Sequence, residues 1–227
     1  MEHFQEVPDI NRLIISPLYL REGLEFAKNQ GYNNILIDAH TTTTDIYGIS
    51  CKHTLNVSLI CEYDFIETLI IQGYDHTIEP CNLNQLSVLP RLNKLGLWAD
   101  KVFTIDFSLF QKLEELKYYH TKQTENVDTL INLKRLHIYN LKSEDLKELK
   151  SMNLLEELTL WDAKNINLNG LCQLTNIRML DIVRSRKMVD IRGLCNSNRL
   201  EELTLSYCNN ITDISVLSHI SGLKTLR

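Results

Sequence analysis

The sequence lacks the features by which many enzymes and membrane proteins are first recognised. It contains no Gly-rich phosphate loop, no GxSxG and no HExxH motif, which argues against the commonest enzyme classes. No apolar run approaches the length that spans a membrane. The first residues, 1–6, show no basic segment followed by an apolar one, so no signal peptide is evident. We therefore expect a cytoplasmic protein without a membrane segment.

Excess basic charge and closely spaced cysteines are also missing. The 24 Lys and Arg residues against 29 Asp and Glu give a net charge of −5, which disfavours nucleic acid and anionic membranes as partners. The six cysteines are scattered and form no CxxC pair. We expect reduced thiols, with Cys172, Cys195 and Cys208 acting as small buried apolar residues. We also expect no metal and no cofactor.

A repeat dominates what remains: leucine or isoleucine, two residues, leucine, one residue, apolar. Seven copies and a truncated eighth open at Ile66, Leu92, Leu113, Leu133, Leu155, Ile177, Leu200 and Leu223, at spacings of 26, 21, 20, 22, 22, 23 and 23 residues. Each copy begins with period-two alternation, which indicates a short strand. Steps of three follow, as in Leu146, Leu149 and Met152, and these suit 3₁₀ turns.

One such copy cannot bury its own apolar edge, so the copies must stack into a continuous core. The sequence therefore predicts an α/β fold in which residues 66–227 form a solenoid. A curved parallel β-sheet should line its concave face, and 3₁₀ or irregular turns its convex face.

The segment 200–205, LEELTL, followed by 211–217, ITDISVL, resembles leucine-rich repeat proteins, specifically the short 22-residue bacterial class of the internalins. The resemblance implies a leucine-rich repeat solenoid, but not the internalins' role in attachment to host cells. The chain departs from that class at the buried asparagine of each turn. That position holds Tyr74, Asp100, Thr121, Leu141, Ala163, Ser185 and Cys208, so the turn amides need other hydrogen-bond partners.

Residues 1–65 are organised differently and are predicted to form an N-terminal α/β cap over the first repeat. Ser16 and Pro17 favour the start of a helix, and Gly31 its end. Residues 34–37 read as a buried strand. Shorter strands are predicted at 46–50 and 55–59.

A catalytic interpretation of the cap rests on five residues close in sequence: Asp38, His40, Asp45, Cys51 and His53. They show neither metal-ligand spacing nor a nucleophile motif. We interpret them as polar loop residues at strand ends, and we predict that the protein is not an enzyme.

Variable positions of the strands carry the candidate site, because solenoids bind through the extended sheet face. Four consecutive copies place Trp98, Tyr119, Tyr139 and Trp161 in one outward column, and exposed strips of this kind tend to be binding sites. The same column is also compatible with rings that only stiffen the sheet, or with rings that a loop of the protein covers. The residues that flank this column complete the predicted partner-binding set: His120, His137, Asn140, Asp162, Arg184 and Tyr207.

A second column, directly after each opening leucine, alternates in charge: Glu114, Lys134, Glu156, Arg178, Glu201 and Lys224. In a parallel, in-register sheet, alternation replaces repulsion by cross-strand pairing. We interpret this column as support for the register.

These observations predict a non-catalytic protein–protein interaction module, serving as a scaffold or as an immunity protein that holds a toxin inactive. The alternative is a module that binds carbohydrate or a small ligand on the same rings. The last copy stops inside its strand at Arg227, so we expect either that the natural protein continues or that its open sheet edge pairs with a partner or in a homodimer.

Overall fold

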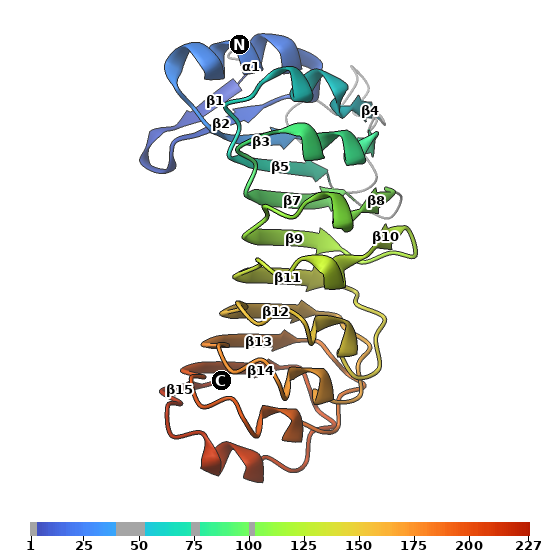
Figure 1. Ribbon diagram of the computed structural model, residues 1–227, viewed down its shortest axis with the longest axis vertical. Helices are drawn as coiled ribbons and strands as arrows, with labels where there is room; N and C mark the ends of the chain where they lie inside the picture. Colours follow the sequence, from blue (N-terminus) through green and yellow to red (C-terminus); the bar gives the residue numbers. More distant parts are fainter. Residues whose placement is uncertain (1–3, 40–52, 74–77, 100–102) are drawn as a thin grey trace, which may run out of the picture. The chain divides into compact units, whose positions relative to one another are not determined.

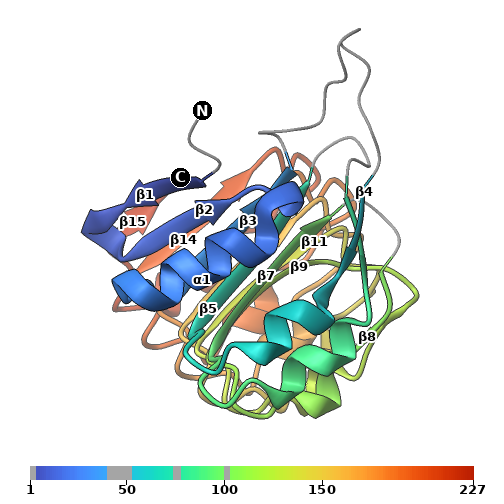
Figure 2. The ribbon, with the colours of Figure 1, turned by 90° about the horizontal axis from the view of Figure 1, so that it is seen from above.

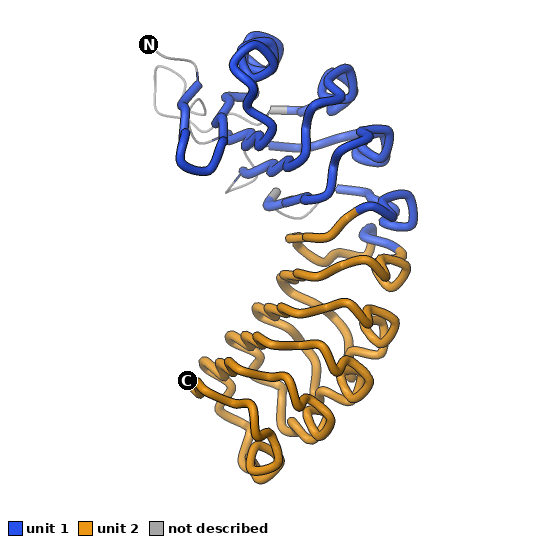
Figure 3. Tube along the Cα trace, turned by 60° about the vertical axis from the view of Figure 1, so that its left-hand side comes forward, with its two compact units in different colours: residues 1–112, 123–125 blue, residues 113–122, 126–227 orange. Residues whose placement is uncertain are grey.

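The computed structural model describes residues 4–39, 53–73, 78–99 and 103–227, with backbone alone at His53 and Ala99. The chain divides into two compact units (Figure 3). Unit 1 comprises residues 1–112 and 123–125, and unit 2 comprises residues 113–122 and 126–227.

Unit 1 contains a sheet of strand order β1-β2-β3-β5-β7, antiparallel between β1 and β2 and parallel elsewhere (Figure 1). Two smaller parallel pairs, β4 with β6 and β8 with β10, flank it. Its strands are β1 Phe4–Val7, β2 Arg12–Ile15, β3 Asn34–Asp38, β4 His53–Asn56, β5 Thr68–Gly73, β6 Ile78–Cys81, β7 Lys94–Ala99, β8 Ile105–Asp106 and β10 Thr124–Glu125. Its helices are η1 Pro8–Ile10, η2 Pro17–Tyr19, α1 Leu20–Gln30, η4 Val57–Glu62, η5 Leu83–Val88 and η6 Phe107–Leu109, where η marks a 3₁₀ helix.

Helix α1 lies alongside β2 (Figure 2). The contact is tight, because a methyl group added at Gly23 would come within 2.6 Å of the Ile15 side chain. Ser16 caps η2 by accepting a hydrogen bond from the Leu18 N–H at 3.3 Å, and α1 follows directly. At the other end Gly31 adopts the left-handed conformation, with φ of 80°, that a helix C-terminus favours.

The predicted start, stop and following strand of this segment are therefore confirmed, with β3 at Asn34–Asp38. The strand predicted at 55–59 is wrong beyond Asn56, whose side chain caps the 3₁₀ helix η4 and so ends the strand. The strand predicted at 46–50 lies outside the described residues. The division between a cap, 1–65, and repeats, 66–227, stays a prediction.

Unit 2 is a stack of coils, each with one strand and one 3₁₀ turn on the opposite side. The strands form an all-parallel sheet of order β9-β11-β12-β13-β14-β15. They are β9 Glu115–Tyr119, β11 Arg135–Tyr139, β12 Glu157–Trp161, β13 Met179–Val183, β14 Glu202–Ser206 and β15 Thr225–Leu226. The turns are η7 Val127–Thr129, η8 Lys147–Leu149, η9 Asn169–Leu171, η10 Arg192–Leu194 and η11 Ser215–His219.

The core of unit 2 follows the alternation of the sequence. In β11, Leu136 and Ile138 are buried while the residues between them are partly exposed, and β9, β12 and β13 show the same pattern. Leucines of the three-residue step, such as Leu146 and Leu149, are buried under the turns. The predicted solenoid of parallel strands and 3₁₀ turns is confirmed.

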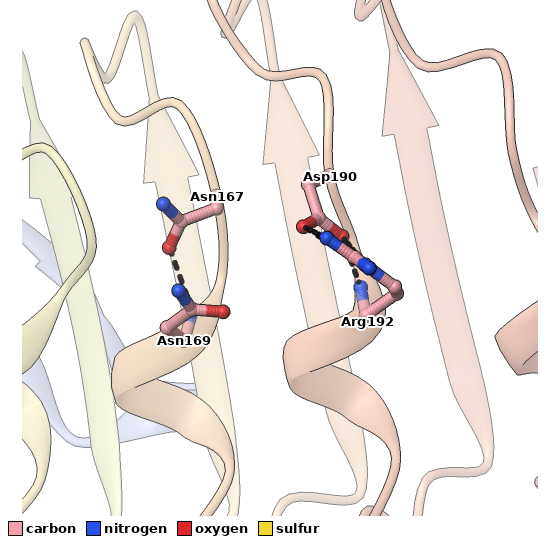
Figure 4. A network of polar contacts seen from close by, with 4 residues as sticks. All are labelled: Asn167, Asn169, Asp190 and Arg192. Atoms are coloured by element: carbon pink, nitrogen blue, oxygen red, sulfur yellow. Dashed lines mark hydrogen bonds and ion pairs between the residues drawn. The ribbon is translucent and has the colours of Figure 1, made fainter.

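Most turns begin in the same way, with an Asn or Asp side chain that accepts a hydrogen bond from the backbone N–H two residues later. Figure 4 shows this at Asn167 and Asp190 in consecutive coils, where Asn169 and Arg192 donate at 3.0 and 2.8 Å. Asp190 also holds the Arg192 guanidinium. In the part of the chain that the structure describes, such residues are Asn56, Asp106, Asp145, Asn167, Asp190 and Asp213.

The position of the missing buried asparagine is filled by small or apolar side chains in unit 2. Leu141, Ala163, Ser185 and Cys208 are all buried there. As expected, the backbone finds other partners: the Lys164 N–H donates to the Leu141 carbonyl of the preceding coil at 2.8 Å. Cys208 Sγ contacts the Ile182 carbonyl at 3.5 Å. Backbone pairing between coils thus replaces the side-chain ladder.

The cysteines follow the prediction only in part. Cys208 is buried as expected, but Cys172 is partly exposed and Cys195 is exposed. The last two follow the convex leucines Leu171 and Leu194 directly, where the chain leaves its 3₁₀ turn and reaches the surface. The prediction that they are buried is therefore wrong.

Candidate functional site

Three of the predicted rings line up on the sheet of unit 2. The strand register pairs Tyr119 with Tyr139, and Tyr139 with Trp161, so the three end neighbouring strands at the same level. Their neighbours along each strand are buried in the core, and the rings themselves are partly exposed on the outer face. We call Tyr119, Tyr139 and Trp161 the aromatic row.

Two rings of the row, those of Tyr139 and Trp161, are held by stacking. Tyr139 and Trp161 stack with ring centroids 5.6 Å apart and planes 24° apart. His137 reaches the same face two residues before Tyr139, and its ring lies 4.6 Å from that of Tyr139 at 13°. Stacked aromatic pairs contribute about 0.5–1.5 kcal/mol each beyond their burial. Tyr139 and Trp161, with His137, therefore form a fixed surface rather than a set of independent side chains.

The row has a defined end on its β13 side. The next residues at this level are Val183 and Ser206, which are smaller. Trp98, the fourth predicted member, is the next-to-last residue of β7 in unit 1, beside Gln72, and is partly exposed. The predicted alignment is thus found for the three residues of unit 2, and Trp98 is placed within unit 1.

His137, which stacks on Tyr139 of the row, is kept uncharged by its surroundings. Burial lowers the pKa of His137 to about 4, and the charge of Lys117 on the neighbouring strand adds to the effect, whereas Asp181 opposes it. Burial also lowers the pKa of His120. Both imidazoles are therefore uncharged at neutral pH.

Glu115 links the charges at the start of these strands. Its carboxylate pairs with Lys117 at 3.2 Å and with Arg135 at 3.0 Å. Burial acts to raise the pKa of Glu115, but the two cations outweigh it and lower the pKa. The charge at this strand position alternates along the sequence, as Lys94, Glu115, Arg135 and Glu157, and this alternation predicts the Glu115–Arg135 pair. The contact with Lys117 was not predicted, although residues two apart on a strand share a face.

The rim of the row consists of residues that directly follow the strands. Asn140, Asp162, Arg184 and Tyr207 all adopt left-handed backbone conformations, with φ of 56°, 53°, 59° and 56°. At the first three of these residues the backbone N–H donates to a carbonyl of the next strand, as Asn140 does to Trp161 at 2.8 Å, and the chain then turns. Asp162 and Arg184 form an ion pair at 3.4 Å, and Tyr207 is 71% exposed. His120 holds the same place after β9 and is partly exposed.

The predicted alternation of charge does produce cross-strand pairs. Lys134 meets Glu114 at 2.9 Å, and Glu201 lies between Arg178 at 2.8 Å and Lys224 at 2.7 Å. These pairs are exposed, so each contributes about 0–1 kcal/mol. Arg178, Glu201 and Lys224 also line a shallow hollow of about 360 Å³ with Asn198, Arg199 and Gly222. The hollow lies at the N-terminal ends of the strands, whereas the residues of the aromatic row lie at the C-terminal ends of theirs.

Of the five polar residues weighed for catalysis in the cap, the structure describes only Asp38 and His53. His40, Asp45 and Cys51 lie outside the described residues. Asp38 ends β3, and His53 begins β4. Across the described ranges, no group of three or more His, Cys, Asp or Glu side chains is arranged to hold a metal ion. Within the same ranges, no helix is long and apolar enough to cross a bilayer.

Neither a protein-family model nor a curated protein matches the chain. Solved structures do. Internalin C2 from Listeria monocytogenes is 19% identical, with a TM-score of 0.63 over 91% of this chain and 83% of that chain. A leucine-rich repeat protein of Leptospira interrogans is 19% identical, with a TM-score of 0.57 over 82% of this chain and 55% of that chain. TLR13, solved in complex with single-stranded RNA, is 16% identical, with a TM-score of 0.56 over 91% of this chain and 30% of that chain.

The chain therefore has the leucine-rich repeat fold, and the resemblance to internalin repeats is confirmed at the level of the fold. At these identities the likeness shows the fold alone, so function rests on the residues of this chain.

Proposed function

We propose that the sheet face of unit 2 binds a partner protein through the aromatic row. One observation carries the proposal: the strand register aligns Tyr119, Tyr139 and Trp161 side by side on an outer face, where they are partly exposed. Solenoids bind through this face, and Trp and Tyr are the commonest residues at interface hot spots. The stacked pair Tyr139–Trp161 costs a partner little ordering entropy, since its rotamers are already constrained.

The surroundings of the row fit a protein interface. Polar and charged side chains follow it on the rim, including the exposed Tyr207 and the Asp162–Arg184 pair. A dry aromatic centre with a polar rim is the usual composition of such interfaces. The proposed role is non-catalytic. A scaffold, or an immunity protein that holds a toxin inactive, is the narrower form that we propose by analogy with bacterial repeat proteins.

A carbohydrate or small ligand is the second candidate, because planar rings also stack on sugars. The ring of Tyr139 already stacks with His137 and Trp161, which reduces the ring face that a sugar needs. This favours a protein, which can use ring edges as well as faces. Nucleic acid is disfavoured by the net charge of −5.

The test compares binding with and without the row. Tyr139→Ala/Trp161→Ala is the test variant, and Leu154→Ala/Val189→Ala is the control, since Leu154 and Val189 are 48% and 46% exposed and lie outside the strands. Partners captured from an extract of the source organism by the wild type are identified and their affinities measured. We expect at least a 30-fold loss for the test variant, as for hot spots worth about 2 kcal/mol, and none for the control.

Equal affinity of the wild type and the folded test variant for every captured partner would make the row a purely structural stack. A glycan array tests the second candidate, the binding of carbohydrate.

Self-association through β15 is the other contact that we propose. Sedimentation at several concentrations tests it, and a mass that stays monomeric throughout excludes it.

A further inference from the structure

Two thiols of unit 2 occupy the same place in consecutive coils. Cys172 directly follows η9 and Cys195 directly follows η10. Their backbones are nearly identical, with φ and ψ of −55° and −24° at Cys172 and −56° and −24° at Cys195. Each backbone N–H closes the preceding 3₁₀ turn: that of Cys172 donates to the Asn169 carbonyl at 3.2 Å, and that of Cys195 to the Arg192 carbonyl at 3.0 Å. Equal backbone angles direct the two Cα–Cβ bonds alike within their coils.

The two turns that carry the thiols are in direct backbone contact. A methyl group added at Gly193 would lie 1.9 Å from the Leu168 carbonyl oxygen. A parallel bridge joins Asn167 to Asp190 just before the turns, which lie side by side in Figure 4. After the turns, the Asn196 side-chain amide donates to the Cys172 carbonyl at 3.1 Å. Contacts before and after the turns thus hold the two cysteines at neighbouring positions.

The neighbouring thiol also affects the acidity of Cys172. Burial raises the pKa of Cys172, and the nearby Cys195 thiol raises it further. Cys195 is exposed, so a reagent in solution reaches it first, whereas Cys172 is partly covered. Such a pair differs from the buried Cys208, whose thiol contacts backbone carbonyls.

We propose that Cys172 and Cys195 form a dithiol site that low-molecular-weight disulfides oxidise to an internal disulfide. The Cys195 thiolate attacks one sulfur of the small disulfide, whose S–S bond breaks and releases one thiol. The Cys172 thiolate then attacks Cys195 Sγ, breaks the mixed disulfide and releases the second thiol. The two cysteine protons pass through solvent to the two released thiolates. One small disulfide is reduced to two thiols while the two cysteines are oxidised.

The new disulfide links one coil covalently to the next. It closes a loop as long as one repeat, which restricts the unfolded chain and so stabilises the folded one. We expect the unfolding temperature to rise by about 5 °C. Under reducing conditions the pair stays open, as expected for reduced thiols.

The experiment exposes the native protein to oxidised glutathione and maps its cysteines by mass spectrometry without reduction. The wild type should give a Cys172–Cys195 cross-linked peptide and retain no glutathione on Cys195. In Cys172→Ser the second step is blocked, so Cys195 should keep glutathione. Cys81→Ser, in which the pair is intact, should behave as the wild type.

Circular dichroism before oxidation checks that each variant is folded, and serine is close to cysteine in size. Glutathione retained on Cys195 of the wild type, with Cys172 still reduced, would overturn the proposal. Cross-links between molecules through Cys195 would do the same. Because the site lies on the turns and not on the sheet face, these outcomes leave the proposed partner binding untouched.

Discussion

Replacing Gly193 by alanine should force two coils of unit 2 apart. The added Cβ would lie 1.9 Å from the Leu168 carbonyl oxygen and 2.3 Å from its carbon. Non-bonded heavy atoms separate by about 3.5 Å, so the turns must move by roughly 1.5 Å. Both atoms belong to the backbone, and no side-chain rotation relieves the contact.

The energetic cost follows from the bonds that such a shift breaks. The Val189 N–H donates to the Ile166 carbonyl of the preceding coil at 2.9 Å, and a movement of this size takes the bond beyond hydrogen-bonding distance. One lost bond costs about 1 kcal/mol, and overpacking adds about 1–3 kcal/mol. We therefore expect Gly193→Ala to lower the free energy of unfolding by about 3 kcal/mol.

Urea unfolding followed by tryptophan fluorescence measures this value. The chain has two tryptophans, so a Trp98→Phe background leaves Trp161 as the reporter of unit 2. Gly222→Ala is the matched control, because its Cβ would meet the Asn198 carbonyl oxygen at 3.0 Å, a contact that a few tenths of an ångström relieve. A loss below about 1 kcal/mol for Gly193→Ala, or equal losses for both variants, would refute the reasoning.

Three further predictions concern the row and its supports. In a double-mutant cycle, Tyr139→Ala and Trp161→Ala should show a coupling of about 1 kcal/mol in urea unfolding followed by circular dichroism, since Trp161→Ala removes the fluorescent reporter; additive losses would mean that the stacked rings do not stabilise each other. Because the folded pKa of His137 is lowered to about 4 from the usual 6.5, the unfolded chain binds more protons between these values, so stability should fall as the pH drops through this window. The loss should be about 1–2 kcal/mol after allowance for solvent screening, and His137→Gln should abolish it. Asp190→Ala should cost about 1 kcal/mol in urea unfolding by removing the side-chain hydrogen bond to the Arg192 N–H at the start of η10, whereas Asp190→Asn, which keeps the accepting oxygen, should recover most of the loss.

Within the site, the order of the rings was predictable but their packing was not. Residues two apart on a strand share a face, and parallel strands in register place equal positions side by side, so Tyr119, Tyr139 and Trp161 could be aligned from spacing alone. The stacking of His137 on Tyr139 depends on side-chain rotamers, which spacing does not determine. The same holds for Glu115, whose choice between Lys117 and Arg135 depends on geometry; it contacts both.

Which residues of the 3₁₀ turns are buried and which are exposed was harder to infer from the sequence. Cys172 and Cys195 follow buried leucines and were expected to be buried, yet the chain turns outward one residue later. The Asn and Asp caps of the turns were not predicted either, because a single polar residue before an apolar one is a weak local signal. Burial in a turn of this kind is set by the coil stacked beside it rather than by local pattern.

The sequence by itself determined the repeat, its strands and turns, and which residues face outward on each strand. Those properties follow from apolar periodicity, because a coil that cannot bury its own edge must stack on a similar neighbour. Only the tertiary structure decided how outward residues meet: the stacked row on the sheet, the bridge at Glu115, and the two thiols brought together on consecutive turns. These contacts join residues about one repeat apart. Their geometry depends on how closely the backbones of neighbouring coils pack, and at Gly193 no room is left for a Cβ atom beside the Leu168 carbonyl.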